Sequence, residues 1–263
     1  VHVVGPGEGE MACGEYGLGR LAKPDEIVEA INQLVGASGA PLAGLSALVT
    51  AGPTHEPIDP VRYIANRSSG KQGYAIARAL AAAGARTTLI AGPTALVDPP
   101  GLTTIHVETA NQMLDAVKEA LPADIAICAA AVADWRAKDS AEQKIKKAKK
   151  TRGGEPSLQL AENPDILAYI GGRKRARPRL VVGFAAETQN VIANAKAKLK
   201  AKGADWILAN DVSPQSGVMG GERNKVHLLT QDGVETWPEM SKAEVASGLV
   251  ERLAGKFAPV KVK

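Results

Sequence analysis

The chain has 263 residues, of which 45% are hydrophobic and 3% aromatic, and its formal net charge is +4. This length fits one large α/β domain, or one domain plus a fragment, with a core of Ala, Val, Ile and Leu. Two cysteines, Cys13 and Cys128, exclude a disulfide framework, so we expect a cytoplasmic protein. No apolar run approaches the ~18 residues of a membrane span and no signal peptide is visible, so no membrane partner is expected.

The positive charge is concentrated in two segments, residues 138–152 and 173–179. A basic patch can bind nucleic acid, but neither segment has interleaved aromatic residues for base stacking. A nucleotide triphosphate is a smaller polyanion that would explain the first segment equally well. Nucleic acid is therefore not an expected partner.

The first part of the chain resembles a fragment. Val1–Val4 is predicted to be a short strand, followed by a glycine-rich loop, Gly5–Arg20, and a helix that opens at Pro24. Since the chain begins with Val, we expect that something in front of it has been lost. Residues 37–41 have the composition of a linker.

From Leu42 onward, strands alternate with helices. The predicted strands are Ala47–Val49, Thr87–Ala91, Thr103–Val107, Ile125–Ala131, Leu180–Phe184 and Trp206–Ala209. The predicted helices span about 70–84, 110–121 and 189–202, and a last one starts at a capping box, Ser241 to Glu244. Asn224–Leu229 and Val234–Trp237 should form a hairpin. This order predicts an α/β fold, a mostly parallel sheet with helices on both faces plus a C-terminal hairpin.

The most informative stretch is Thr50–Gly73, which joins a buried strand to a helix. Most such connections have about 2–6 residues, so this one indicates a small-molecule site, although an ordinary connection with good turn residues is the alternative. Its end, Arg67-Ser68-Ser69-Gly70-Lys71, suits an anion such as a phosphate just before a helix N-terminus. It matches neither the Walker spacing nor a strict G-x-G-x-x-G.

Four later segments each allow two interpretations. Asp134, after the alanine run 129–131, is either poised over a site or a turn residue. The polar run from Lys144 to Gly154 is either a solvated face or a lysine-rich lid over a nucleotide. Asn163 is predicted as the N-cap of a helix with Pro164 in its first turn. Helix capping alone explains these residues, although it is compatible with a contact to a ligand. Phe184 fits a core position as well as a site. Lys198 and Lys202, four residues apart on one helix face, fit a solvated surface as well as a site.

Read together, these segments resemble one family. The run G-P-T-x-E-x-x-D-x-V-R-x-x-x-N-R-S-S-G-K-x-G at 52–73 resembles the substrate loop of phosphopantothenate–cysteine ligase. A-A-V-A-D-W-R, K-I-K-K, N-P-D-I and G-F-A-A-E-T follow in the family's order. In most bacteria this ligase is fused behind a decarboxylase, and residues 11–20 resemble the end of that domain. The resemblance implies a Rossmann-like fold, with residues 1–36 as the decarboxylase remnant and 42–263 as the ligase domain.

The resemblance also implies roles for individual residues. Asn66 would contact the acid substrate and the intermediate, and Lys144 would stabilise the transition state. The implied nucleotide-binding residues are Cys128, Ala129, Ala130, Asp134, Lys144, Pro164, Asp165, Ile166, Leu167, Phe184, Lys198 and Lys202. The implied substrate-binding residues are Asn66, Arg62, Arg67, Ser68, Ser69 and Gly70, where the two arginines fit a structural or dimer-contact role equally well.

The implied reaction joins 4'-phosphopantothenate to L-cysteine with CTP and Mg²⁺, the ion being held largely by the phosphates, so no protein metal ligands are expected. The residues do not distinguish CTP from ATP.

Cys13 would be the orphaned proton donor of the decarboxylase, or a spare thiol, and FMN belongs to the missing domain. A homodimer through the ligase domain is implied, within a higher oligomer in the full-length fusion. The rivals are a nucleotide-binding or nucleic-acid-binding module without catalysis, and a nicotinamide oxidoreductase, whose glycine fingerprint is missing.

Overall fold

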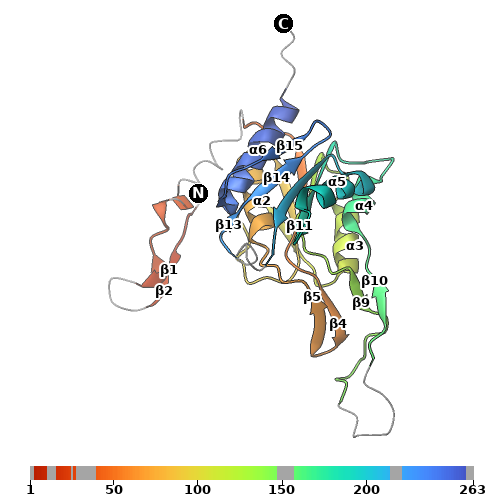
Figure 1. Ribbon diagram of the computed structural model, residues 1–263. Coiled ribbons are helices and arrows are strands. Elements are labelled where there is room, and N and C mark those ends of the chain that lie inside the picture. The colour runs from red at the N-terminus through yellow and green to blue at the C-terminus, as the bar shows by residue number, and fades with distance from the viewer. Residues whose placement is uncertain are drawn as a thin grey trace, which may run out of the picture.

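The computed structural model describes residues 3–10, 16–24, 26–27, 40–146, 157–213 and 221–258. Its central element is an eight-stranded sheet with the order β15-β14-β12-β11-β8-β3-β6-β7 (Figure 1). The strands are β3 Ser46–Ala51, β6 Arg86–Ala91, β7 Thr103–His106, β8 Ile125–Cys128, β11 Leu180–Glu187, β12 Trp206–Asp211, β14 Val226–Leu229 and β15 Val234–Thr236. Neighbours from β12 to β7 are parallel, and β14 and β15 are antiparallel. The predicted fold class, including its C-terminal hairpin, is confirmed.

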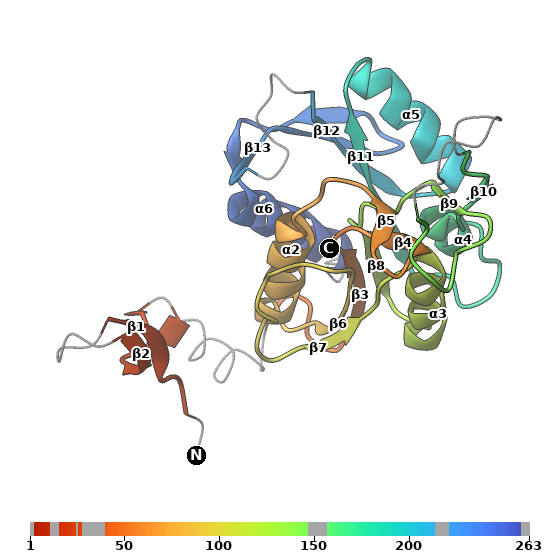
Figure 2. The ribbon, with the colours of Figure 1, turned by 90° about the horizontal axis from the view of Figure 1, so that it is seen from below.

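Helices cover both faces of this sheet, as Figure 2 shows by looking along the strands. One face carries α2 Lys71–Ala82 and α6 Lys242–Phe257, and the other carries α3 Ala110–Ala120, α4 Ile166–Gly171 and α5 Val191–Lys202. The predicted helices at 70–84, 110–121 and 189–202 are thus present with slightly shorter bounds. The capping box at α6 is also confirmed, since Ser241 and Glu244 exchange bonds between side chain and backbone amide.

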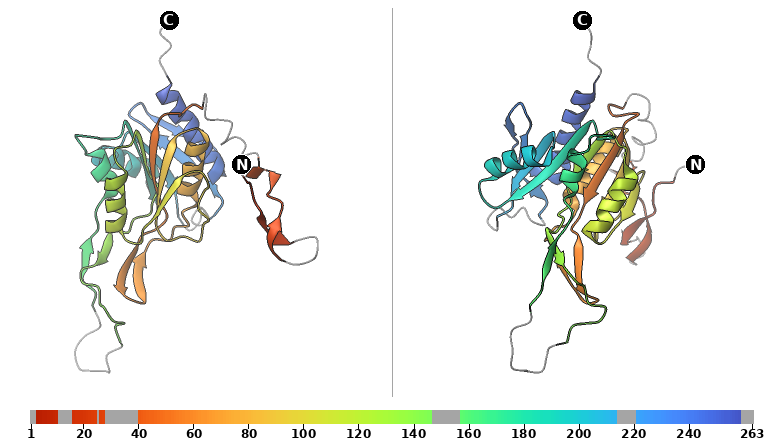
Figure 3. Two further views of the ribbon diagram at one scale, coloured as in Figure 1. Left: turned by 180° about the vertical axis from the view of Figure 1, so that it is seen from behind. Right: turned by 90° about the vertical axis from the view of Figure 1, so that its right-hand side faces the viewer.

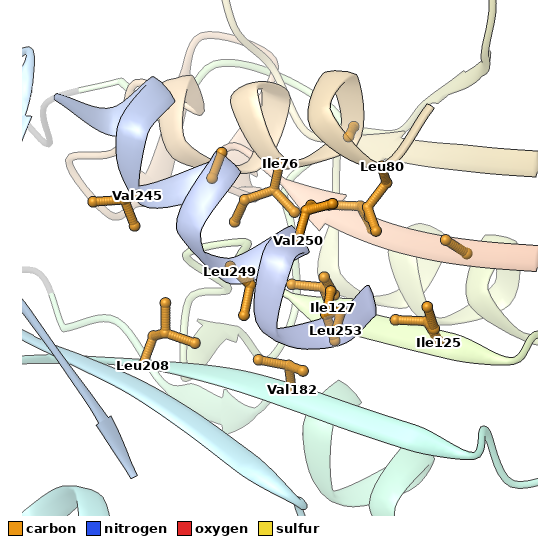
Figure 4. Packing of buried hydrophobic residues seen from close by; sticks show 14 of the residues in the cluster. Ile76, Leu80, Ile125, Ile127, Val182, Leu208, Val245, Leu249, Val250 and Leu253 are labelled. Atoms are coloured by element: carbon orange, nitrogen blue, oxygen red, sulfur yellow. The ribbon is translucent and has the colours of Figure 1, made fainter. Parts of the chain in front are cut away.

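The core lies in two layers because successive strand residues point to opposite faces. In β3, Leu48 belongs to the layer under α3, α4 and α5, whereas Val49 belongs to the layer under α2 and α6. Figure 4 shows the second layer, where Ile76 of α2 and Leu249 of α6 lie among fully buried aliphatic side chains. Each such side chain contributes roughly 1.5–3 kcal/mol by leaving water. Aliphatic burial therefore holds the sheet and its helices together, as the aromatic-poor composition required.

The strand order reverses at β3. From β3 the chain proceeds outward through β6 and β7, then returns through α3 to β8, on the other side of β3, and continues to β11 and β12. The carboxyl ends of β3 and β8 therefore flank a topological switch point. Open α/β sheets bind ligands at such points.

The predicted N-terminal layout is wrong in two respects. Val3 and Val4 are exposed and belong to no strand, whereas the expected glycine-rich loop contains a hairpin of β1 Gly7–Glu10 and β2 Tyr16–Arg20. Val3 and Val4 have no pairing partner among the described residues, whereas β1 and β2 satisfy each other's backbone groups. Pro24 is helical, as expected for the start of a helix.

Two further small hairpins extend from the carboxyl end of the sheet (Figures 1 and 3). One consists of β4 His55–Asp59 and β5 Arg62–Ala65, inside the stretch expected to be a loop. The other pairs β9 Trp135–Ala137 with β10 Leu160–Glu162. The strand expected at Ile125–Ala131 ends at Cys128, although the amides of Ala129 and Ala131 still donate to the carbonyl oxygens of Thr50 and Gly52. A short β13 Arg223–Asn224 pairs with β16 Met240–Ser241 just before α6.

Candidate functional site

A cleft of about 950 Å³ opens at the carboxyl ends of β3, β8, β11 and β12. It contains nearly all of the residues that the sequence assigned to a site, although they come from segments far apart in the chain. These are Asn66, Arg67, Ser68, Ser69, Gly70, Cys128, Ala129, Ala130, Asp134, Pro164, Asp165, Ile166, Leu167, Phe184, Lys198 and Lys202. The cleft therefore lies at the switch point where this fold places its ligands.

The stretch after β3 is tied to the turn after β8. The Asn66 side-chain amide donates to the carbonyl oxygen of Val132 at 3.0 Å, and the Thr54 hydroxyl accepts from the Ala133 amide at 3.0 Å. The Ala129 amide donates to the carbonyl oxygen of Thr50 at 3.0 Å. These bonds hold the two loops together as one surface, so the backbone of the turn after β8 positions Asn66.

The first turn of α2 is open to the cleft and suits an anion. Gly70 precedes the helix with φ +75°, a conformation that favours glycine, and no side chain caps the helix. At Gly73 a Cβ would lie 2.5 Å from the Cβ of Ala51, so only glycine lets this turn sit directly on the end of β3. Uncapped amides and the positive end of the helix dipole then face the ligand space.

The alanine turn after β8 forms a smooth wall with no reactive group. Burial, followed by the nearby carboxylate of Asp165, raises the pKa of the Cys128 thiol to about 12, against the opposing effect of Lys198. The thiolate is the nucleophilic form, so Cys128 stays protonated near neutral pH. This geometry agrees with the prediction that Cys128 is a wall of the site.

The predicted cap at Asn163 is wrong. The N-cap of α4 is Asp165, whose carboxylate accepts from the Ala168 amide at 2.8 Å. The Asn163 side chain instead donates to the carbonyl oxygen of Ala133 at 2.8 Å, which ties β10 to the turn after β8. The Asn163 side-chain oxygen, the atom that a cap would use, accepts from the Arg136 guanidinium at 3.4 Å. The helix begins two residues later than expected, and Pro164 lies ahead of the cap.

One side of the cleft, here called the α5 wall, consists of Asp165, Phe184, Lys198 and Lys202. The Lys198 ammonium donates to the carbonyl oxygen of Phe184 at 2.8 Å, and Lys202 pairs with Asp165 at 2.6 Å. Burial raises the pKa of Asp165, but the bonds from Lys202 and the Ala168 amide outweigh it, so the pKa lies below its ordinary value. The lysines share a helix face because they are four residues apart, as predicted.

The opposite side, here called the α2 wall, consists of Lys71, Gln72, Asn210, Asn224 and Lys242. The sequence pointed to Lys71 as part of an anion site, but sequence reasoning missed the role of the other four residues. The Gln72 side-chain amide donates to the carbonyl oxygen of Lys242 at 3.0 Å, and the Asn210 amide donates to the Asn224 side-chain oxygen at 3.2 Å. Asn210, Asn224 and Lys242 are all buried. A polar residue at the carboxyl end of a buried strand, such as Asn210, was the available signal.

Arg62 and Lys144 do not line the cleft. The Arg62 guanidinium pairs with the buried Asp59 carboxylate and donates to the carbonyl oxygen of Ile145 at 2.8 Å, while the Ile145 amide donates to Asp59 at 3.1 Å. The guanidinium holds the pKa of Asp59 well below its usual range, against the opposing effect of burial. Asp59 and Arg62 thus anchor the segment that carries Lys144, which is itself exposed.

Arg67 and Cys13 were also predicted as site residues. Arg67 lies at the cleft with an exposed side chain, and it makes no hydrogen bond or ion pair with any other residue in the described ranges. Cys13 lies outside the described residues, so its predicted role stays a prediction. No helix within the described parts of the chain is long and apolar enough to cross a bilayer.

Comparison with known proteins identifies the family to which this fold belongs. Residues 42–256 match the family model of the DNA/pantothenate metabolism flavoprotein C-terminal domain. The coenzyme A biosynthesis bifunctional protein CoaBC of Haemophilus influenzae is 45% identical over 258 residues, covering 98% of this chain and 63% of the relative. CoaBC of Bacillus subtilis is 42% identical over 253 residues, covering 95% and 61%.

The chain thus spans a little over three fifths of the length of these curated relatives. A crystal structure of the C-terminal domain of a CoaBC protein superposes with a TM-score of 0.69 at 39% identity, covering 83% of this chain and 98% of that one. The match over residues 42–256 includes the whole sheet and every segment of the cleft. This chain belongs to the family of the DNA/pantothenate metabolism flavoprotein C-terminal domain.

Proposed function

We propose that this chain is a phosphopantothenate–cysteine ligase that uses CTP. The observation that carries the proposal is the convergence of the loop after β3, the alanine turn and the lysines of α5 on one cleft at the switch point. The similarity to the C-terminal domain of a protein named for coenzyme A biosynthesis supports the same activity.

The reaction has two steps. The carboxylate of 4'-phosphopantothenate attacks the α-phosphorus of CTP, which forms an acyl-cytidylate and releases pyrophosphate. The amine of L-cysteine then attacks the acyl carbon, CMP leaves with the electron pair of the broken bond, and the amine loses a proton as the amide forms. Activation is needed because a free carboxylate does not accept an amine.

The cleft supplies binding and orientation for the first step. The α5 wall would hold the nucleotide, with the small side chains of Ala129 and Ala130 allowing close approach to the backbone. Asn66, fixed to the carbonyl oxygen of Val132, would orient the acid substrate across from it. Lys144, on the segment anchored by Asp59, would stabilise the charge that develops at the α-phosphate.

Magnesium would enter with the triphosphate. The described residues contain no group of three His, Cys, Asp or Glu side chains that could hold a metal ion. Mg²⁺ characteristically binds substrate phosphates and keeps several waters, so this cleft is compatible with an ion brought by the nucleotide. The ion would neutralise phosphate charge. As part of the same proposal, the chain forms a homodimer that completes the acid-substrate site.

The test is pyrophosphate release by the 263-residue chain with 4'-phosphopantothenate and Mg²⁺, comparing CTP with ATP, with and without L-cysteine. We expect release that depends on CTP and on the acid substrate, and that accelerates when cysteine is added. Omitting 4'-phosphopantothenate is the control for simple hydrolysis. Binding of CTP without any release, in a sample shown to be dimeric, would favour a binding module and contradict the proposal.

A further inference from the structure

Asp59 is a buried carboxylate that belongs to the motif at 52–73 but lines neither wall of the cleft. It is the last residue of β4, in the hairpin that extends from the carboxyl end of the sheet (Figure 3). Its side chain has no exposed surface. Burying a charge is costly unless the group is paired and hydrogen-bonded, so the bonds that this carboxylate accepts show what it holds in place.

The two oxygens of Asp59 accept hydrogen bonds from two different segments. One oxygen accepts from the amides of Val61 and Arg62, each at 2.9 Å, which closes the turn of its own hairpin. The other accepts from Nε of the Arg62 guanidinium at 2.9 Å and from the amide of Ile145 at 3.1 Å. The same guanidinium donates to the carbonyl oxygen of Ile145 at 2.8 Å. The Asp59–Arg62 pair therefore holds both backbone polar groups of a residue that lies 86 positions away from Asp59 in the sequence.

Lys144 directly precedes this clamped residue. A further bond, from the Ala141 amide to the carbonyl oxygen of Ile58 at 2.9 Å, ties the chain ahead of Lys144 to the same strand, β4. The backbone is thus attached to β4 on both sides of Lys144, whose own side chain is exposed. The described residues give the Lys144 ammonium no hydrogen bond or ion pair, so the backbone attachments decide where this side chain starts.

We propose that Asp59 is a positioning residue, which fixes the backbone of Lys144 through Ile145 for the step that releases pyrophosphate. The role of Lys144 in that step belongs to the proposed function, on which this assignment rests. The same hairpin continues through β5 to Asn66, which is tied to the carbonyl oxygen of Val132 at 3.0 Å. One hairpin therefore carries both the residue expected to contact the acid substrate and the anchor of the residue expected to act on the nucleotide.

The test compares pyrophosphate release and CTP binding in Asp59→Asn, in Lys144→Met and in the double variant. Asparagine keeps the shape of the side chain, but its amide nitrogen cannot accept the bonds that one carboxylate oxygen accepts. We expect kcat to fall by roughly ten- to a hundredfold in Asp59→Asn, since a displacement of about 1 Å can cost that much in rate. The Kd for CTP should stay near the wild-type value, because Asp59 does not line the cleft. The double variant should be no slower than Lys144→Met, since nothing is then left to position.

Asp124→Asn is the matched control. Its carboxylate also accepts from a distant backbone amide, that of Ser46 at 2.9 Å, but Ser46 is the first residue of β3 and lies at the other end of the sheet from the cleft. Both variants should lower the melting temperature, and only Asp59→Asn should lower kcat. If Asp59→Asn does not fold, Ile145→Pro takes its place, because proline removes the amide that donates to Asp59. Ile145→Ala keeps that amide and should keep the wild-type kcat.

Hydrogen exchange of the unliganded chain tests the anchor separately from the reaction. The amides of residues 141–145 should exchange faster in Asp59→Asn than in the wild type, and at the wild-type rate in Asp124→Asn. If the wild type released no pyrophosphate, the ligase proposal would fail, while this exchange would still decide whether Asp59 holds the segment. Unchanged exchange, a wild-type kcat in a folded Asp59→Asn, or a double variant in which the two losses in rate multiply would each overturn the positioning role.

Discussion

The two walls of the cleft each present two lysines, but they use them differently. On the α5 wall both ammonium groups already have protein partners, the carbonyl oxygen of Phe184 for Lys198 and the carboxylate of Asp165 for Lys202. On the α2 wall Lys71 has Glu222, and Lys242 has no ion-pair partner among the described residues. A ligand must therefore displace existing bonds on the α5 wall, whereas on the α2 wall it meets a lysine, Lys242, that makes no such bond with a described residue.

This difference suggests a division of work. A wall whose ammonium groups already have protein partners is held in shape without ligand and can orient a base and a sugar. A wall with a lysine that has no ion-pair partner among the described residues gains most from a multiply charged group. The lysine count alone does not show this, since it is the hydrogen-bond partners that separate the walls.

The largest effect should come from a residue on neither wall. Replacing Lys144 with Met should lower kcat for pyrophosphate release about a hundredfold, because a charge that acts mainly in the transition state affects the chemical step. CTP binding should change little, since Lys144 does not line the cleft. Steady-state kinetics and titration with CTP measure the two quantities. Lys138→Met, at the other end of the same segment, is the control; a raised KM with unchanged kcat in Lys144→Met would contradict the idea.

The packing of α2 against β3 gives the next largest effect, this time on stability. Gly73→Ala should lower the free energy of unfolding by about 1–3 kcal/mol, because its Cβ would overlap Ala51. The same substitution at Gly255, in α6, meets no atom within 4 Å and should stabilise the helix by roughly 0.5–1 kcal/mol. Urea denaturation of both variants measures the contrast. Equal effects at the two positions would show that the α2 wall is not held by this close contact.

Lys202→Met tests the α5 wall. It should weaken CTP binding by less than about tenfold, because Lys202 must leave Asp165 before it can serve a ligand. Lys200→Met is the matched control, being exposed on another face of the same helix. If Lys202→Met weakened CTP more than Lys242→Met did, the proposed difference between the walls would be reversed. Titration under identical salt conditions makes the comparison direct.

The sheet and the position of the cleft could be predicted because their signals are local, whereas most of the individual cleft residues were implied only by the family resemblance. Apolar runs that alternate with amphipathic helices define a parallel sheet, and a long polar connection after a strand marks the ligand end. The spacing of Lys198 and Lys202 placed them on one face, where the structure has them. These features depend on neighbours within a few residues along the chain.

The features that could not be predicted depend on distant partners. Pro57 and Pro60 argue against strands, yet β4 and β5 pair there as an isolated edge hairpin, where a missing donor is tolerated. Asn163 is a good N-cap by type, but its side-chain oxygen accepts from Arg136 and its side-chain nitrogen donates to the carbonyl oxygen of Ala133. The capping box at Ser241 explained its segment without reference to Lys242, and only the lining of the cleft shows that this residue reaches it.

The smallest effect concerns the pH dependence of the Lys202–Asp165 pair. Since the pKa of Asp165 is lower in the folded protein than its ordinary value, the pair stabilises the fold above the unfolded pKa, and this contribution disappears as the pH falls through the folded pKa. The melting temperature of the wild type should exceed that of Lys202→Met by a few degrees at most near pH 7, since a partly exposed pair is worth about 0–1 kcal/mol. The gap should close as the pH is lowered toward about 3. Differential scanning fluorimetry across that range, with Lys200→Met as the control, measures it. A gap that persisted in acid would mean that Lys202 stabilises the α5 wall by packing its aliphatic stem, and that the carboxylate of Asp165 does not hold it in place.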